Sequence, residues 1–274
     1  MPAPSLSFIG TATTLLRLGG FTLLTDPNFL HRGQRAYLGK GMWSRRRTEP
    51  AAQPDQLPEL DAVVLSHLHG DHFDRAARHG LDKHVPVVTT AQAARRLRRW
   101  GFAETVPLQP WDSTELTGDG QRLRITAVPG VHAPGIVDRV MPPVIGTVLE
   151  HRGANGGSTV YITGDVLFRP ELSEVSRRFP DLDTMVVHLG GTRILGLLLT
   201  MDARQGADLV DLLRPPVTIP VHYDDYPVFK SPLSDFLDEV RRRGLPGTVR
   251  TVHRGETVEL GAGLQTRPIG SEER

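Results

Sequence analysis

The sequence contains no cysteine among its 274 residues. This absence excludes disulfide bonds, thiolate metal sites and cysteine nucleophiles together, and it leaves the redox compartment undetermined. Nitrogen and oxygen side-chain atoms remain as the means of binding a metal ion. Any metal centre in this chain is therefore built from such ligands.

Long hydrophobic runs and a strong net charge are absent as well. The longest apolar segment, at 194–201, is far shorter than the roughly 18 residues of a membrane span. The first residues lack the basic and apolar regions of a signal peptide, so we expect a cytoplasmic protein with no transmembrane segment. The formal charge of +1 provides no general attraction to nucleic acid, which is therefore not an expected partner.

The composition that remains is typical of a globular protein, with 39% hydrophobic and 23% charged residues. We expect one domain spanning 1–274, because this length suffices for one large core. Short β-branched or leucine-rich runs predict strands, and amphipathic patterns predict helices. The early strands, followed by alternating strands and helices, predict an α/β fold. Strands are expected at 6–9, 13–18, 21–25, 62–66, 85–89, 123–128, 145–150, 159–163, 184–188 and 217–221, and helices at 90–100, 170–179, 202–213 and 232–243. A long irregular loop is expected over 28–60.

The segment LSHLHGDHFD directly follows a predicted strand, where open α/β sheets place their sites. His67 and His69 are two residues apart, so they project to the same side of an extended backbone. Gly70 permits a change of direction that turns Asp71 and His72 towards a second point. A lone histidine is more often a surface or core residue than a ligand, but this density predicts metal binding. Two metal ions close together would use all four side chains.

Three further ligands follow predicted strands elsewhere in the chain. His132 lies in AVPGVHA, Asp165 in VYITGDV and His222 in VTIPVHYDD. Each side chain offers nitrogen or oxygen at a strand end. We therefore expect all three to converge with the histidine-rich segment on one rim of the sheets.

The string His-x-His-x-Asp-His at 67–72, followed by His132, Asp165 and His222 in that order, resembles the metallo-β-lactamase superfamily of dinuclear metallohydrolases. The resemblance extends over nearly the whole chain. In LLTDPNF, LSHLHGDHFD, YITGDVLFRP and PVHYDDYP it is closest to one branch. That branch contains the N-acylphosphatidylethanolamine phospholipase D-like and the ascorbate-6-phosphate lactonase-like proteins.

The resemblance implies an αββα four-layer sandwich with two divalent metal ions and a metal-bridging hydroxide as nucleophile. Zinc is the expected metal, with manganese and iron as alternatives, because imidazole and carboxylate ligands suit all three. Two of the ligands, Asp71 and Asp165, are also predicted to be catalytic. The resemblance places His67, His69 and His132 on one metal, Asp71, His72 and His222 on the other, and Asp165 between both.

Other residues have a functional and a structural interpretation. Asp26, in LLTDP, resembles a carboxylate that orients a ligating histidine, but Asp-Pro also forms turns. His188 ends a predicted strand and is a candidate catalytic proton donor or substrate contact. Its alternative is a hydrogen-bonded core histidine, and it departs from the pattern expected of the phospholipase-like branch. Asp74 and Asp202 are interpreted as helix caps.

Several polar and basic residues are candidates for the substrate mouth. The arginines at 45–47 could bind a phosphate or carboxylate, although a solvated charge run is the commoner case. Tyr223, Asp224 and Asp225 follow a ligand, but polar loop residues are usually only solvated. The arginines at 95–99 fit an ordinary amphipathic helix. Only three of the 32 basic residues are lysines, so the many arginines indicate compositional bias.

The preferred function is hydrolysis of a phosphodiester or phospholipid-like substrate. The alternatives are hydrolysis of lactones or amides at the same metal centre, a non-catalytic binding protein, and di-iron redox chemistry. Redox chemistry is disfavoured because His69 stands where the diiron flavoprotein branch is expected to have glutamate. A degenerate binder would have lost a ligand, and none is missing. A small molecule or a lipid-like substrate is the expected partner, and Leu195 and the leucines at 197–199 suit a lipid chain if exposed, or a core.

Overall fold

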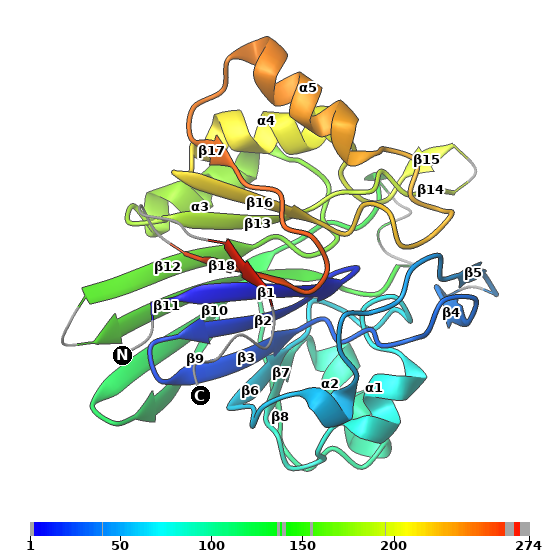
Figure 1. The fold of residues 1–274 in the computed structure, drawn as a ribbon, viewed down its shortest axis with the longest axis vertical. Helices are drawn as coiled ribbons and strands as arrows, with labels where there is room; N and C mark the ends of the chain where they lie inside the picture. Colours follow the sequence, from blue (N-terminus) through cyan, green and yellow to red (C-terminus); the bar gives the residue numbers. More distant parts are fainter. Residues whose placement is uncertain are drawn as a thin grey trace.

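Two β-sheets pack face to face in the computed structural model, and helices cover both outer sides (Figure 1). The structure describes residues 3–39, 41–135, 138, 141–153, 156–194, 196–260 and 266–268. No helix in these ranges is both long and apolar enough to cross a membrane. The prediction of a single domain over 1–274 stays a prediction.

The first sheet has eight strands in the order β19-β18-β1-β2-β3-β6-β7-β8. The segment from β3 to β8 is parallel. Helices α1 (Arg75–Gly80) and α2 (Ala91–Arg99) pack on this sheet. Its strands are β1 (Ser5–Gly10), β2 (Thr13–Leu18), β3 (Phe21–Thr25), β6 (Ala62–Val64), β7 (Val87–Thr89), β8 (Thr105–Pro107), β18 (Glu256–Glu259) and β19 (Thr266–Pro268).

The second sheet has seven strands in the order β17-β16-β13-β12-β11-β10-β9, and the segment from β12 to β17 is parallel. Helices α3 (Ser173–Arg178), α4 (Ala203–Leu213) and α5 (Leu233–Arg243) cover it. Its strands are β9 (Ser113–Gly118), β10 (Gln121–Pro129), β11 (Ile145–Gly153), β12 (Gly156–Ile162), β13 (Thr184–His188), β16 (Val217–Val221) and β17 (Thr248–Val249).

Alternation along the strands divides the core into layers. On β3, Leu23 belongs to the core between the two sheets, whereas Leu24 faces the helices of the first sheet with Leu97 of α2. On the other side, Phe236 of α5 packs with the outer face of the second sheet. These layers confirm the predicted αββα sandwich.

The predicted strands and helices are present, with small differences at their ends. The expected helix at 170–179 begins as the 3-10 turn η3 (Pro170–Leu172), with Pro170 in its first turn, and continues as α3. Short edge strands such as β8 and β17 were not predicted, since two or three residues carry too little periodicity.

The expected irregular loop over 28–60 contains regular structure. It forms the hairpin of β4 (Arg35–Tyr37) and β5 (Trp43–Arg45), followed by the 3-10 turn η1 (Pro54–Gln56). The apolar run at 194–201 forms a second hairpin, β14 (Arg193–Ile194) with β15 (Leu197–Leu198). Leu197 is 40% exposed, whereas Leu199 is buried, so the run has both exposed and core positions. Leu195 lies outside the described residues.

Candidate metal centre

All the predicted ligands lie at the carboxyl ends of strands, on one edge of the sandwich. The segment with His67 and His69 follows β6 of the first sheet. His132 follows β10, Asp165 follows β12 and His222 follows β16 of the second sheet. Strands β10 and β12 point the same way, because both are antiparallel to β11. The two sheets therefore present their ligands to one shared site.

Three buried histidines form the first candidate metal group. His67 Nε2 lies 2.9 Å from His69 Nδ1, and His132 Nε2 lies 3.4 Å from the same atom. The other ring nitrogen of His132 lies 2.8 Å from the backbone carbonyl of Asp165. A carbonyl only accepts, so this Nδ1 carries the proton and Nε2 is free to bind a metal.

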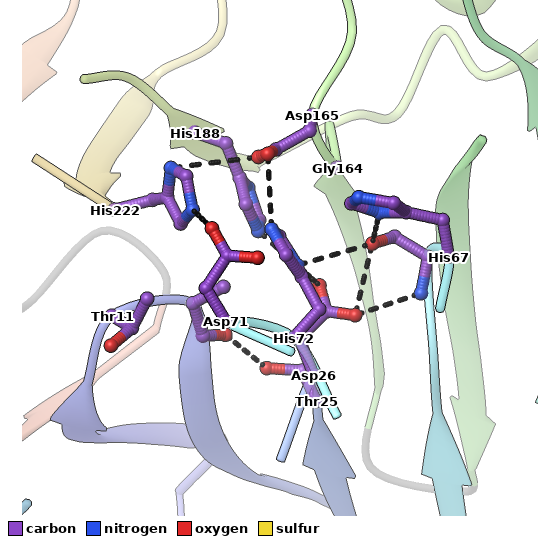
Figure 2. Close-up of polar contacts among 12 residues, drawn as sticks. Thr11, Thr25, Asp26, His67, Asp71, His72, Gly164, Asp165, His188 and His222 are labelled. Atoms are coloured by element: carbon purple, nitrogen blue, oxygen red, sulfur yellow. Dashed lines mark hydrogen bonds and ion pairs between the residues drawn. The ribbon is translucent and has the colours of Figure 1, made fainter. Parts of the chain in front are cut away.

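The second candidate group consists of Asp71, His72, Asp165 and His222, all buried. His72 Nε2 lies 3.0 Å from Asp165 Oδ2, and His222 Nε2 lies 3.5 Å from Asp71 Oδ2. The Nδ1 of His222 donates to the carbonyl of Leu189 at 3.1 Å, which again leaves Nε2 free. Figure 2 shows His72 between Asp165 and Asp26, with Asp71 and His222 beside it.

Unpartnered buried atoms in this group fit a cation. Asp71 Oδ1 and Asp165 Oδ1 are buried and form no hydrogen bond, while the buried Nε2 atoms of His72 and His222 have carboxylates of the same group, those of Asp165 and Asp71, as ion-pair partners. Buried polar atoms without partners are costly, and natural proteins rarely leave several together. Carboxylate oxygens and imidazole nitrogens are the ligands that zinc accepts. The donor set therefore fits divalent metal ions.

The two groups differ in charge. Burial, together with the neighbouring His72, lowers the pKa of His67 well below its usual value, and burial lowers that of His69 to about 4. The first group is therefore neutral, as histidine ligands of a metal must be. Burial alone would also lower the pKa of His72, but the carboxylates of Asp165 and Asp26 raise it well above its usual value. Without a metal ion, the carboxylates of Asp165 and Asp26 are therefore paired with His72.

Asp26 lies beside His72 and His188, which is one of the two placements that the sequence left open. Its Oδ2 lies 3.3 Å from His72 Nδ1 and 3.4 Å from His188 Nε2, and its Oδ1 accepts hydrogen bonds from the N–H and hydroxyl of Ser66. Burial raises the pKa of Asp26, but His72 and His188 together outweigh this effect and lower it to about 2. A charged carboxylate therefore holds the ring of His72.

His188 is fully buried and does not belong to either ligand group among the described residues. Its ring stacks on His72 with centroids 6.0 Å apart, and its Nδ1 lies 3.4 Å from the Thr163 hydroxyl. Together with Asp26 and His72 it forms a third set of close donors. Its predicted catalytic role stays a prediction, and the placement favours positioning of Asp26 over contact with substrate.

Ser66 was missed by the sequence analysis. Its hydroxyl lies 3.0 Å from His67 Nδ1 while it donates to Asp26. One residue thus connects a ligand of the first group to the carboxylate behind the second. A serine next to the first histidine is too common a pattern to identify this role from one sequence.

Backbone conformation at the site is unusual. His222 and Asp26 have positive φ values of 62° and 36°, which non-glycine residues seldom adopt. The N–H of His222 donates to the carbonyl of Thr11 at 2.7 Å, which ties this residue to the first sheet. Such strain persists only where surrounding contacts impose it, and it is common at functional sites.

Gly70 has a different role from the one expected. Its φ is not positive, so its freedom to adopt left-handed backbone is not used. A Cβ at this position would lie 2.7 Å from the backbone N and O of Tyr37, and the Gly70 N–H donates to the Tyr37 carbonyl at 2.8 Å. Glycine therefore allows the ligand segment to pack against β4.

Some of the basic and acidic residues considered for the mouth of the substrate site are buried, and others are exposed. Arg46 is buried, where it donates to Asn28 and forms an ion pair with Asp225 at 3.3 Å, so both residues are structural. Arg45 and Arg47 are exposed. Asp224 is ion-paired with Arg254, and Tyr223 packs at the edge of the outer core of the second sheet.

Comparison with known proteins identifies the family. Residues 22–223 match the model of the β-lactamase superfamily domain, a range that contains every predicted ligand. The chain therefore belongs to the metallo-β-lactamase superfamily.

Relatives within this family span nearly the whole chain. A metal-dependent hydrolase of Deinococcus radiodurans is 30% identical over 262 residues, which cover 92% of this chain and 97% of the relative. A metal-dependent hydrolase of Opitutus terrae is 26% identical and covers 93% and 99% of the two chains.

Solved structures show the same fold. A possible metal-dependent hydrolase from Veillonella parvula has a TM-score of 0.79 at 21% identity, covering 94% of this chain and 100% of the other. An isothiocyanate hydrolase from Delia radicum gut bacteria has the same values. At this identity the likeness concerns the fold alone.

Proposed function

We propose that this protein is a metal-dependent hydrolase that binds two divalent metal ions and acts on a phosphodiester or phospholipid-like substrate. One observation carries the proposal: two buried ligand groups, three histidines in one and two histidines with two carboxylates in the other, meet at one edge, and each group combines residues from both sheets. Membership of the superfamily, and relatives that bear the name metal-dependent hydrolase, support it.

The metal ions would be held by the two groups described above, with Asp165 proposed as the residue shared by both. Bound there, two divalent ions supply a nucleophile at neutral pH and stabilise negative charge on the attacked group. The protein's own side chains keep ring nitrogens and carboxylate oxygens directed at this point. Zinc is the proposed metal, with manganese and iron as alternatives, because nitrogen and oxygen ligands accept all three.

Asp71 and Asp165 are the proposed catalytic residues, and His188, which the sequence also predicts to be catalytic, is proposed as a positioning residue. The buried carboxylates of Asp71 and Asp165 provide the negative charge that balances two adjacent cations. Because His188 Nε2 lies 3.4 Å from Asp26, we propose that it acts through this carboxylate and keeps His72 oriented.

The choice of a phosphorus-containing substrate rests on the resemblance to the phospholipase D-like branch. Lactone and amide hydrolysis use the same metal chemistry and are the alternative outcomes of the test. The proposed substrate is a small molecule or a lipid-like molecule, and the proposed location is the cytoplasm.

The test combines metal analysis with turnover of bis-p-nitrophenyl phosphate, a lactone panel and an amide panel. We expect two metal ions per chain. His69→Ala and Asp165→Ala should lower kcat/KM by more than the roughly 10- to 100-fold loss that removing an outer partner of a ligand causes. His79→Ala and Asp181→Ala, at exposed positions, serve as matched controls. Full turnover in the first two variants would refute the metal mechanism, and strong lactonase without phosphodiesterase activity would overturn the substrate class.

A further inference from the structure

A cleft of about 770 Å³ lies beside the candidate metal centre. His69 and Gly70 form part of its wall, so it is continuous with the first ligand group. Much of the remaining wall comes from the β4–β5 hairpin and from helices α1 and α2, which lie on the same side of the molecule in Figure 1. We call it the arginine cleft, because its lining includes Arg35, Arg75, Arg78, Arg95, Arg96 and Arg99.

In the part of the chain that the structure describes, no carboxylate neutralises the arginines of the arginine cleft. Within the described part of the chain, none of its six arginines forms an ion pair with a carboxylate, whereas Arg241 on α5 pairs with Asp238 at 2.7 Å. Asp74 is the carboxylate in the lining, but it is buried and accepts hydrogen bonds from the backbone N–H groups of Phe29, Leu30 and Ala77. Unpaired guanidinium groups in a concave site attract anions.

Aromatic side chains hold and border these cations. The guanidinium carbons of Arg78 and Arg96 lie 4.8 and 5.3 Å from the centroid of the Trp100 ring, so one ring positions two charges. Tyr37 and Trp43 lie on the opposite wall with centroids 4.9 Å apart and are 45% and 61% exposed. Exposed aromatic rings in a concave site provide area for a planar or apolar ligand.

Helix geometry explains why these arginines share one face. Arg75 and Arg78 are three residues apart on α1, and Arg95 and Arg99 are four residues apart on α2, so each pair lies on one side of its helix. Arg98 is directed elsewhere and donates to the Thr105 hydroxyl at 2.7 Å. Arg95, Arg96 and Arg99, but not Arg98, therefore belong to the wall of one cleft.

We propose that the arginine cleft binds an anionic group of the substrate that does not react, carried on an aromatic or apolar body. The bond to be hydrolysed would lie at the ligand groups beside His69, and the remote phosphate, sulfonate or carboxylate would lie among the arginines. This inference rests on the proposed hydrolase function and narrows its substrate to molecules with a second negative charge.

A binding experiment tests the cleft separately from turnover. The probe is 1-naphthalenesulfonate, titrated calorimetrically into the metal-loaded protein, because arginine binds sulfonate well and transition metals bind it weakly. Arg78→Gln/Arg96→Gln should raise its Kd about tenfold or more, as expected for lost charge-assisted bonds. Arg98→Gln, on the same helix, should leave Kd unchanged.

A second variant guards against loss of folding. Arg95→Gln/Arg99→Gln changes exposed side chains and should also weaken binding, with an unchanged circular dichroism spectrum. Equal Kd values in wild type and both double variants would overturn the proposal. So would equally tight binding of neutral 1-naphthalenemethanol, which would show that the charge is not recognised.

A kinetic comparison separates this proposal from the proposed function. Bis-p-nitrophenyl phosphate and 4-carboxyphenyl p-nitrophenyl phosphate release the same p-nitrophenolate, but only the second has a remote anion. In the two double variants, KM for the carboxylated diester should rise about tenfold. Its kcat, and both constants for the other diester, should stay nearly unchanged. This result would support anion binding in the arginine cleft. If neither diester is hydrolysed but the sulfonate still binds, the proposed phosphodiesterase activity would be wrong and the proposed anion site would stand. If KM changes equally for both diesters, the proposed anion site would be wrong and the proposed phosphodiesterase activity would stand.

Discussion

Single residues behind the ligands decide how the site is ordered. Asp26 contacts His72, His188 and Ser66 at once, and Ser66 contacts His67 in turn. Fixing the ring orientation before a metal arrives lowers the entropic cost of binding. Affinity for the metal therefore depends on residues that do not touch it.

Asp26→Asn should lower zinc affinity about 10- to 100-fold, because a neutral amide holds His72 less firmly than a carboxylate does. A titration of zinc against a competing chelating dye measures the change. Asp61→Asn is a matched control, since this exposed carboxylate accepts the N–H of Thr22 on the same strand pair. Unchanged affinity in Asp26→Asn would show that the ligands are ordered without it.

The buried neutral histidines make stability depend on pH. Burial lowers the pKa of His69 from 6.5 to about 4. Between these values the unfolded chain binds a proton that the folded chain does not, so this contribution to stability is complete above pH 6.5 and is lost as pH falls towards 4.

In metal-free protein, protonation linked to His69 should lower the free energy of unfolding by about 1.4 kcal/mol for each unit by which pH falls within this window. His69→Gln removes the titrating group, so its stability should fall less steeply. Urea unfolding at several pH values after treatment with a chelator measures both slopes. Parallel curves for the two proteins would contradict the expectation.

At the scale of elements, capping residues fasten the helices around the site. Asp74 was interpreted from the sequence as a cap, and its Oδ1 accepts the Ala77 N–H at the start of α1. Its other oxygen accepts the N–H groups of Phe29 and Leu30, which anchors the segment that leads to β4. Asp202 likewise caps α4 through the N–H of Gln205. Both cap predictions are confirmed.

Asp74→Ala should cost about 3 kcal/mol of unfolding free energy, because it leaves three buried backbone N–H groups without partners. Thr90→Ala removes only the single cap bond of α2 and should cost about 1 kcal/mol. Chemical denaturation of the two variants measures the difference. Equal losses would show that the bonds to Phe29 and Leu30 contribute little.

Across the whole molecule, the candidate metal centre joins the two sheets. His67, His69, Asp71 and His72 come from the first sheet, and His132, Asp165 and His222 come from the second. A metal ion that binds only the folded chain stabilises it by mass action, by about 4 kcal/mol at a thousand times its Kd.

Zinc added to chelator-treated protein should therefore raise Tm by several degrees, whereas Asp165→Asn should show a much smaller rise. Differential scanning calorimetry with stepwise zinc addition measures both. Equal shifts in wild type and variant would place the stabilising ions elsewhere on the molecule.

Two features could be predicted from the sequence alone: which side chains are candidate ligands, and the α/β order of the elements. Both are local properties: ligand chemistry depends on side-chain type, and strands such as β3 or β13 reveal themselves by a run of suitable residues. The position of each ligand after a strand also predicted which edge of the sandwich they share, because parallel strands end together.

The contacts across the two sheets depend on long-range packing and could not be predicted from the sequence. Ser66 and Asp26 are 40 residues apart, and Arg46 and Asp225 are 179 apart, so no local pattern connects them. The β4–β5 hairpin lies in a segment without clear periodicity, so the sequence did not predict it. The arginines of α1 and α2 line a shared cleft because this hairpin packs beside them. Long-range packing sets such distances, and one sequence does not record them.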